Sequence, residues 1–162
     1  MLATAATPAA FAVGNKDTPR HRRLAGEIYA LDNIWTVLHI MPMSWVVEVG
    51  EEFGPEFSAL QPEVQAELLA LARLLQQIGP QLGRPRVDTL NGSRHANMKE
   101  LRFTAAHREW RVAFAFDTRR QAVLLAAGVK SGRGERRFYR ELLRKADERF
   151  DAHLARIVEK PR

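Results

Sequence analysis

Polar and apolar positions repeat with the period of an α-helix in two stretches of the chain. The first apolar stripe consists of Val64, Leu68, Leu71, Leu75 and Ile78. Because these positions are three or four residues apart, they lie on one face of a helix. Pro62 suits a first helical turn and Gly79-Pro80 ends one, so we predict a helix over residues 62–78. The second stripe, which predicts a C-terminal helix, consists of Phe138, Leu142, Ala146, Phe150, Leu154 and Ile157.

Alternating positions predict strands before and between these helices. Residues 45–49 are aromatic and β-branched, residues 98–103 and 110–116 alternate, and residues 121–128 are apolar almost throughout. Within residues 98–103, Lys99 shares a face with Leu101 and Phe103, whereas Arg102 faces the other way. We therefore predict an α+β fold, in which an N-terminal strand and helices pack on a twisted antiparallel sheet and a C-terminal helix follows.

The strand over residues 110–116 has one bulky face and one small face. Trp110, Val112, Phe114 and Phe116 point one way, and Arg111, Ala113 and Ala115 point the other. An arginine that projects from a shallow floor of alanines is well placed to hold a phosphate. Equally, the two alanines could pack beneath the C-terminal helix. The pattern alone does not separate these two interpretations.

The remaining segments are less regular. Residues 51–60 begin with acidic side chains, as a helix does, and we expect Gly54-Pro55 to interrupt that helix. Residues 82–97 predict a long loop with a turn at Asn91-Gly92, residues 117–120 a hairpin loop, and residues 129–137 a basic loop.

Residues 1–42 differ from the rest of the chain. They combine an Ala/Thr/Pro-rich start, a polar stretch and a short helical pattern over residues 24–40. We interpret them as an N-terminal extension, with Met43 as the expected start of a single domain over residues 43–162. The alternative is an additional helix that docks on the body of the protein or on a partner.

Composition and charge narrow the classes of function. The 162 residues include no cysteine, which excludes disulfides, thiolate catalysis and cysteine-ligated zinc. No apolar run approaches the roughly 20 residues of a membrane helix. The net charge of +6 is uneven, because residues 91–162 hold 18 basic and 9 acidic side chains, and residues 43–90 hold 3 and 7. A basic half favours a polyanion such as nucleic acid as the partner, with a solvated arginine-rich surface as the alternative.

The sequence lacks the common motifs of metal binding, nucleotide binding and acyl transfer. The histidines lack metal-binding spacing, and no glycine-rich phosphate loop or nucleophile elbow is present. We therefore expect no cofactor and no metal. The candidate residues that remain are Arg94, His95, Lys99, Arg102, Arg111, Lys130, Arg133, Arg136, Arg137 and Tyr139.

A basic set of this kind could cleave RNA without a metal. The ribose 2′-hydroxyl attacks the adjacent phosphate, a base removes its proton, cations stabilise the added charge, and an acid protonates the 5′-oxygen. Arginine suits the cationic role, and lysine or histidine could be acid or base if a crowded positive field moves its pKa toward neutrality. Alternatively, Arg102 and Arg111 pair with Glu100 or Glu109 on the surface. From the residues alone, a basic binding surface is the better-supported interpretation.

The order of the elements and three short motifs resemble a known family. The motifs are K-E-L-R at residues 99–102, W-R-V-A-F-A-F-D at residues 110–117, and G-V-K-S-G at residues 128–132 followed by R-R-F-Y. Together they resemble the RelE/ParE superfamily of toxin–antitoxin toxins, and within it the phage-derived, HigB-like branch. The resemblance spans residues 43–157. Val129 departs from the family, which often has an acidic residue there.

The resemblance implies a small cytoplasmic toxin of a type II toxin–antitoxin system. Such a toxin is an endoribonuclease, or mRNA interferase, that cleaves mRNA in the ribosomal A site, inhibits translation and arrests growth. A cognate helix-turn-helix antitoxin of the HigA-like type neutralises it. The motifs carry the catalytic roles over to Arg102, Arg111, Lys99, Lys130 and Tyr139. The other basic candidates, predicted to bind RNA, are Arg94, His95, Arg133, Arg136 and Arg137.

Two other functions fit the same superfamily. A ParE-like protein inhibits DNA gyrase by binding and without catalysis. If this chain had that function, its expression would induce a DNA-damage response, and Arg102 and Arg111 would have no role as phosphate ligands. An inactive relic would only bind an antitoxin and would not arrest growth.

Overall fold

The computed structural model describes residues 45–132 and 134–160. The predictions for residues 1–42, including the helix over residues 24–40 and the start at Met43, lie outside these ranges. Arg133, predicted to bind RNA, is also outside them.

Five strands form one sheet in the order β1-β5-β4-β3-β2. The strands are β1 (Val46–Val49), β2 (Val87–Thr89), β3 (Met98–Ala105), β4 (Arg108–Phe116) and β5 (Gln121–Val129). Strands β3, β4 and β5 pair antiparallel, as predicted, and β2 pairs antiparallel with β3. Strand β1 instead pairs parallel with β5 at the sheet edge, so the sheet is mixed. Strand β2 lies within residues predicted to be loop throughout, because three residues are too few to show an alternating pattern.

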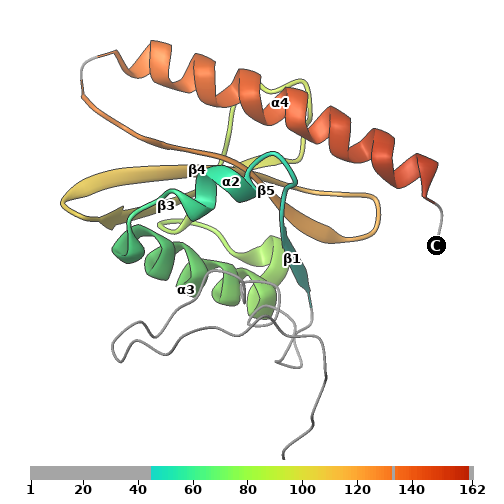
Figure 1. Cartoon of the computed structure of the whole chain (residues 1–162), viewed down its shortest axis with the longest axis horizontal. Coiled ribbons are helices and arrows are strands. Elements are labelled where there is room, and N and C mark those ends of the chain that lie inside the picture. Colours follow the sequence, from blue (N-terminus) through green and yellow to red (C-terminus); the bar gives the residue numbers. More distant parts are fainter. Residues whose placement is uncertain (1–44, 133, 161–162) are drawn as a thin grey trace, which may run out of the picture. The chain divides into compact units, whose positions relative to one another are not determined.

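Two long helices cover opposite faces of this sheet, as Figure 1 shows. Helix α3 (Pro62–Ile78) has the predicted bounds, and α4 (Glu135–Glu159) is the predicted C-terminal helix. The predicted interruption at Gly54-Pro55 was wrong: α2 (Gly54–Ser58) begins there, because proline is tolerated in a first helical turn. Helix α4 also begins inside the predicted basic loop, so Arg136 and Arg137 lie in its first turn. The α+β prediction is confirmed.

Each face of the sheet has its own hydrophobic core. The core beneath α3 includes Leu68, Leu75, Leu101, Val112 and Phe114. The core beneath α4 includes Met98, Ala113, Ala115, Leu142, Ala146 and Phe150. Ala113 and Ala115 are fully buried there, so they pack beneath the C-terminal helix and form no open groove floor.

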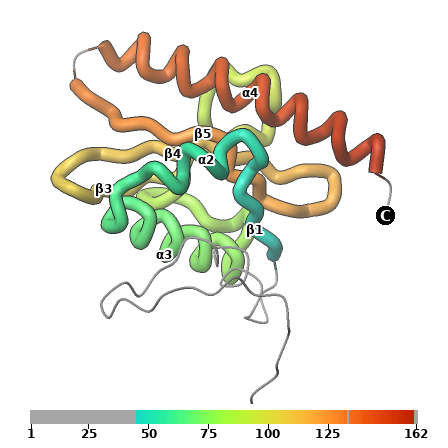
Figure 2. The backbone as a smooth tube through the Cα atoms, in the orientation of Figure 1, coloured from blue at the N-terminus to red at the C-terminus, as the bar shows by residue number. Residues whose placement is uncertain are grey.

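A bulge in β5 fits the sheet to α4. Ala113 pairs with Ala126 and Phe114 pairs with Leu124, so Leu125 is an extra residue on the β5 side. Leu125 and Ala126 therefore both face α4, although they are consecutive. Figure 2 shows the chain leaving β5, turning, and returning over the sheet as α4.

The end of α3 depends on a glycine. Gly79 has a φ of 67°, and a Cβ atom there would lie 2.2 Å from Nε1 of Trp45. Only glycine accommodates both the positive φ and the indole. Because Gly79 has no side chain, the indole of Trp45, the first described residue of the chain, packs directly against the end of α3.

Candidate functional site

The two predicted catalytic arginines lie directly opposite each other. Arg102 on β3 pairs in register with Arg111 on β4, and both side chains lie on the face of the sheet that α4 covers. Like charges at directly opposed positions destabilise a sheet unless other charges compensate them. The compensation here comes from three carboxylates, one on each of three strands.

The central carboxylate belongs to Glu100 and is buried. Its Oε1 lies 3.6 Å from Nε of Arg102 and 3.9 Å from Nε of Arg111. Asp88 on β2 lies 3.2 Å from Nη1 of Arg102, and Glu109 on β4 lies 3.3 Å from Nη2 of Arg111. The side chains of Glu100 and Arg111 are only 5% and 6% exposed, whereas that of Glu109 is 59% exposed. The predicted surface pairing of Arg111 is thus a buried one.

Burial also changes the acidity of Glu100. Loss of solvent raises the pKa of the Glu100 carboxyl above its ordinary value, and the positive charges of Arg111 and Arg102 offset only part of that rise. Within the described chain, the buried Oε2 of Glu100 and Nε of Arg111 have no hydrogen-bond partner. Buried polar atoms in this condition are costly to a fold and are common where a ligand or a proton is to be handled.

The first turns of α4 form the cover of this cluster. The hydroxyl of Tyr139 lies 3.5 Å from Oε1 of Glu100. The neighbouring ring of Phe138 packs on Gly128, the β5 residue paired with Arg111. A Cβ atom at Gly128 would lie 2.7 Å from that ring, so the glycine allows α4 to approach the sheet here.

Lys130 lies at the exit of β5, close enough to Tyr139 and Arg111 to interact with both electrostatically. Its Nζ is 2.9 Å from Oε1 of Glu135, in the first turn of α4. The hydrogen bond to Glu135 raises the pKa of Lys130, opposite to the shift toward neutrality that the sequence suggested for a general base. Lys130 in this position is a cation and a potential proton donor.

The structure separates the other predicted residues from this cluster. Lys99 pairs with Phe114, whose side chain lies in the core beneath α3, so Lys99 is on the other face of the sheet from Arg102. His95 lies 2.7 Å from Asp151 on α4, and its ring meets that of Phe150 edge-on at 4.8 Å. Arg94 also pairs with Asp151.

Those contacts hold the loop that precedes β3 against α4. They lie about 18 Å from Tyr139 along the helix, at about 1.5 Å per residue over twelve residues. Arg136 and Arg137 are different, because both are exposed in the first turn of α4. Neither forms an ion pair with any residue in the described ranges.

Sequence reasoning missed the acidic half of the cluster. It treated Glu100 as a surface partner, although alternation places Glu100 on the same face as Arg102. The register pairs Glu100 with Ala113, and a glutamate opposite an alanine that packs beneath a helix is expected to be buried. That signal was present once the alanines were assigned to the helix interface. Asp88 carried no signal, because β2 was not predicted.

The cluster carries no excess of positive charge. Arg102, Arg111 and Lys130 face the carboxylates of Asp88, Glu100, Glu109 and Glu135. Glu109 and Glu135 are 59% and 52% exposed, and exposed ion pairs contribute little free energy. A phosphate can therefore replace these two carboxylates, while the buried Glu100 stays in place.

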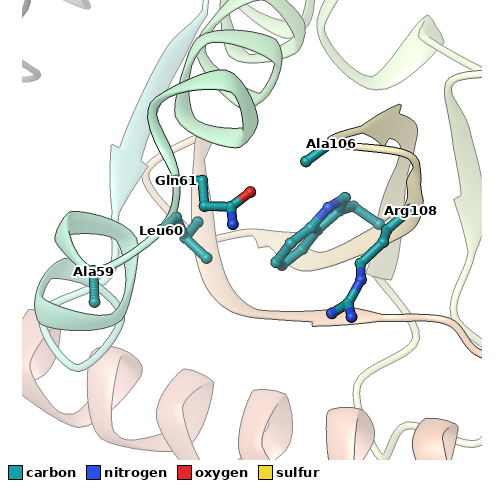
Figure 3. A pocket seen from close by; sticks show the side chains of 6 residues that line it. Ala59, Leu60, Gln61, Ala106 and Arg108 are labelled. Carbon is teal, nitrogen blue, oxygen red and sulfur yellow. The ribbon is translucent and has the colours of Figure 1, made fainter.

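A hollow lies on the opposite face of the sheet. Its volume is about 350 Å³, and it is lined by Ala59, Leu60, Gln61, Ala106, Arg108 and Trp110. Figure 3 shows Leu60 and Gln61 on one side of it and Ala106 and Arg108 on the other. Trp110 packs against the core beneath α3, so this hollow is separate from the cluster around Glu100.

Comparisons with known proteins identify relatives of the chain. Residues 55–151 match the family described as phage-derived protein Gp49-like. The chain is 44% identical over 116 residues to "Putative toxin HigB2" of Mycobacterium tuberculosis, which is 71% of this chain and 57% of that protein. It is 43% identical over 99 residues to "Putative toxin HigB3" of the same organism, which is 61% of this chain and 84% of that protein.

The chain thus spans little more than half the length of the HigB2 protein that it matches. No solved structure matches the chain significantly. Among the described helices, none combines the length and the apolar character that crossing a bilayer requires. The resemblance to the phage-derived, HigB-like branch, predicted from the sequence, is confirmed.

Proposed function

Because the chain belongs to the phage-derived Gp49-like family, we propose that it is the toxin of a type II toxin–antitoxin system and that it cleaves mRNA on the ribosome. The names of both curated relatives contain the word toxin, which supports the coarser part of the proposal. The finer part, RNA cleavage, rests on the cluster around Arg102 and Arg111.

The observation that carries the proposal is the register of the two arginines. Arg102 and Arg111 are directly opposed, and both approach the single carboxylate of Glu100. Two guanidinium groups directed at one anion form a ready phosphate grip, because each planar fork donates two parallel hydrogen bonds. A phosphate that enters here meets both cations at once.

The same residues suit the steps of metal-free RNA cleavage. As the 2′-oxygen attacks phosphorus, negative charge grows on the phosphate oxygens, and Arg102 and Arg111 stabilise it. Lys130 is a cation whose pKa is raised by the hydrogen bond to Glu135, so it suits stabilisation of the growing charge. When a phosphate replaces Glu135, the proton of Lys130 becomes available to the leaving 5′-oxygen. Tyr139 lies on the α4 side of the cluster, where it can contact the ribose.

The proposed partners follow from this function. The ribosome with its mRNA is the substrate complex, in the cytoplasm, and Arg136 and Arg137 are proposed RNA contacts because they are exposed beside the cluster. The proposed antitoxin is a helix-turn-helix protein of the HigA-like type. Arg94 and His95 are weaker candidates for RNA binding, since Asp151 already engages both of them.

Induced expression in a bacterial host tests the proposal. The wild-type chain is expected to arrest growth, and primer extension on cellular mRNA should show new cuts within translated regions. Arg111→Ala should abolish both effects. Arg111→Lys should lose at least about tenfold in cleavage, because it keeps the charge and loses the planar fork. Arg73→Ala, which removes an exposed cation from α3, is the matched control and should remain toxic.

Each alternative has its own signature in this experiment. Growth arrest with intact transcripts and an induced DNA-damage response would favour the gyrase inhibitor. Expression without growth arrest would favour an inactive chain that only binds an antitoxin. Full toxicity of Arg111→Ala would refute the assigned site.

A further inference from the structure

Glu100 was not among the site residues proposed from the sequence. Packing alone does not explain why its carboxylate is buried in the cluster. Its carboxylate is buried between two strands and a helix, and one oxygen has no hydrogen-bond partner within the described chain. A counter-ion for two arginines could equally be exposed, as Glu109 is, or partly exposed, as Asp88 is. The burial of Glu100 therefore calls for a function beyond charge balance.

We propose that Glu100 is the proton acceptor behind Tyr139: its carboxylate takes the phenol proton as Tyr139 takes the proton of the ribose 2′-hydroxyl. Glu100 is then a positioning residue, because it acts through Tyr139 and does not touch the substrate. This inference rests on the proposed function of the chain as an RNA-cleaving toxin.

The arrangement of the two side chains supports a relay. The Tyr139 hydroxyl and Oε1 of Glu100 are 3.5 Å apart, longer than an ordinary O–H···O hydrogen bond. Catalytic hydrogen bonds are often long in the free enzyme and shorten when substrate binds. Tyr139 is partly exposed whereas Glu100 is 4% exposed, so a substrate reaches the phenol before the carboxylate.

The groups that face Glu100 set its basicity. Arg102 on β3 and Arg111 on β4 favour the charged form, as does the Tyr139 hydroxyl on α4, while Asp88 on β2 opposes it. Burial has the largest effect and raises the pKa of Glu100. The carboxylate is thus a stronger base than an exposed glutamate. Within the described residues, no other carboxylate hydrogen bonds to Tyr139.

The step balances with groups that the cluster already contains. The 2′-O–H bond breaks and the 2′-O–P bond forms, while Tyr139 gains one proton and passes its own to Glu100. The P–O5′ bond then breaks, and its electron pair goes to the 5′-oxygen, which takes a proton from Lys130. The products are a 2′,3′-cyclic phosphate and a free 5′-hydroxyl. Glu100 is left protonated and Lys130 neutral, and exchange with solvent restores both.

A pH–rate profile of the full-length chain tests this relay. Purified toxin is mixed with ribosomes programmed with a defined mRNA, and single-turnover cleavage is measured between about pH 5 and 9. The rate is expected to rise with pH through a limb that reports deprotonation of Glu100, above the ordinary pKa of glutamate. Glu100→Gln should cut the maximal rate by about 10²-fold and remove that limb. The ribosome concentration that gives half the maximal rate should change by less than about threefold.

Two further variants separate the relay from charge balance. Glu100→Asp keeps a carboxylate and should keep the limb. Glu109→Gln removes an ion-pair partner of Arg111 that, within the described residues, forms no hydrogen bond with Tyr139, and it should also keep the limb. If Glu100→Gln does not fold, as judged by circular dichroism, Tyr139→Phe serves instead, since it should lose the same limb.

Each outcome decides between the relay and its alternatives. A folded Glu100→Gln protein that is slow but keeps the limb would show that Glu100 is only a counter-ion, and would overturn the relay. Wild-type cleavage by Tyr139→Phe would overturn it as well. A wild-type chain that cuts no mRNA on ribosomes would instead refute the proposed function itself, and the relay with it.

Discussion

The arginines that face each other across β3 and β4 need neighbouring carboxylates to neutralise them, and the sequence pattern does not show this need. Arg102 and Arg111 repel one another at opposed positions, and a sheet tolerates such a pair only when carboxylates neutralise it. Glu100 does so from a buried position, while Asp88 and Glu109 do so from more exposed ones. The difference in exposure separates the buried Glu100, which stays in place, from the exposed Glu109, which a phosphate can replace.

Helix α4 can lie close to the cluster because residue 128, which contacts the ring of Phe138, is a glycine without a side chain. Gly128→Ala would place a Cβ atom 2.7 Å from the ring of Phe138, which must then move and carry the first turns of α4, with Tyr139, away from Glu100. Because the ring can shift, we expect the free energy of unfolding to fall by only about 1 kcal/mol. Cleavage should fall at least about tenfold, since small misplacements of reacting groups are costly.

Urea unfolding and the ribosome cleavage assay measure the two effects of Gly128→Ala separately. Gly54→Ala is the control, because no atom lies within 4 Å of the added methyl group and no positive φ is involved. We expect it to change stability by less than about 0.5 kcal/mol and cleavage not at all. Equal cleavage by Gly128→Ala and the wild-type chain would show that the position of α4 over the cluster does not matter.

The strand pattern indicated that Arg102 and Arg111 share a face of the sheet, but it did not show the carboxylates around them. Alternation was enough to place Arg102 and Arg111 on one face and Lys99 on the other, because side chains in a strand alternate strictly. Burial of Glu100 could not be derived in the same way. It depends on α4 crossing this part of the sheet, which is a tertiary contact between residues 39 positions apart.

At the scale of whole elements, the contacts that hold α4 differ between its two ends. Its C-terminal part forms ion pairs with the segment around α2, where Arg149 and Lys145 contact Glu56, and Arg156 contacts Glu52. Hydrogen bonds from Arg149 and Arg156 lower the pKa values of the Glu56 and Glu52 carboxyls. Its first turns have the long contact to Glu100 and the pair of Lys130 with Glu135. The part of α4 that covers the site is therefore the part with the fewest polar contacts to the body.

Arg149 is the most buried member of the ion pairs between α4 and α2. Its side chain is 16% exposed, and Nη1 donates to the bulge carbonyl of Leu125 at 2.8 Å as well as to Glu56 at 3.1 Å. Arg149→Ala removes these bonds and leaves the Leu125 carbonyl without its donor. We expect a loss of about 2 kcal/mol in the free energy of unfolding, measured by urea denaturation. Because Glu56 is partly exposed, the loss should stay below that of a fully buried pair.

Arg144→Ala is the matched control on the same helix. Arg144 is 53% exposed, and among the residues that the structure describes it pairs only with Glu141 and Glu148 of α4 itself, at i,i+3 and i,i+4 spacing. Such pairs contribute a few tenths of a kcal/mol, so we expect a change below about 0.5 kcal/mol. Similar losses from the two substitutions would mean that the ion pairs between α4 and α2 do not anchor the helix.

The bounds of an element could be predicted where a long periodic pattern ended at a proline or a glycine. Helix α3 combines five stripe positions with Pro62 and Gly79, and its bounds were predicted correctly. Strand β2 has three residues and α2 has five, which is too short for either period to show. The parallel pairing of β1 with β5 was also beyond the pattern, because both strand directions give the same alternation.

At the scale of the molecule, the two halves of the chain differ in charge. Helix α3 and its approach belong to the acidic residues 43–90, whereas α4 belongs to residues 91–162, with 18 basic and 9 acidic side chains. Since the cluster around Glu100 has no net positive charge, attraction to a polyanion must come from exposed cations around it. Arg136 and Arg137 are such cations, in the first turn of α4 and without ion pairs in the described ranges.

Salt dependence distinguishes this long-range attraction from the chemistry of the cluster. Contacts between cations and phosphates release counterions, so the logarithm of the association constant falls linearly with the logarithm of the salt concentration. We expect Arg136→Ala combined with Arg137→Ala to reduce that slope by about 2 for ribosome binding, and to weaken binding most at low salt. Arg73→Ala, which removes an exposed cation from α3, should leave the slope unchanged. The maximal single-turnover cleavage rate of the double variant should stay near the wild-type rate, because neither arginine belongs to the cluster. A double variant that lost maximal rate at an unchanged slope would place Arg136 and Arg137 in the chemistry and leave the attraction to other cations.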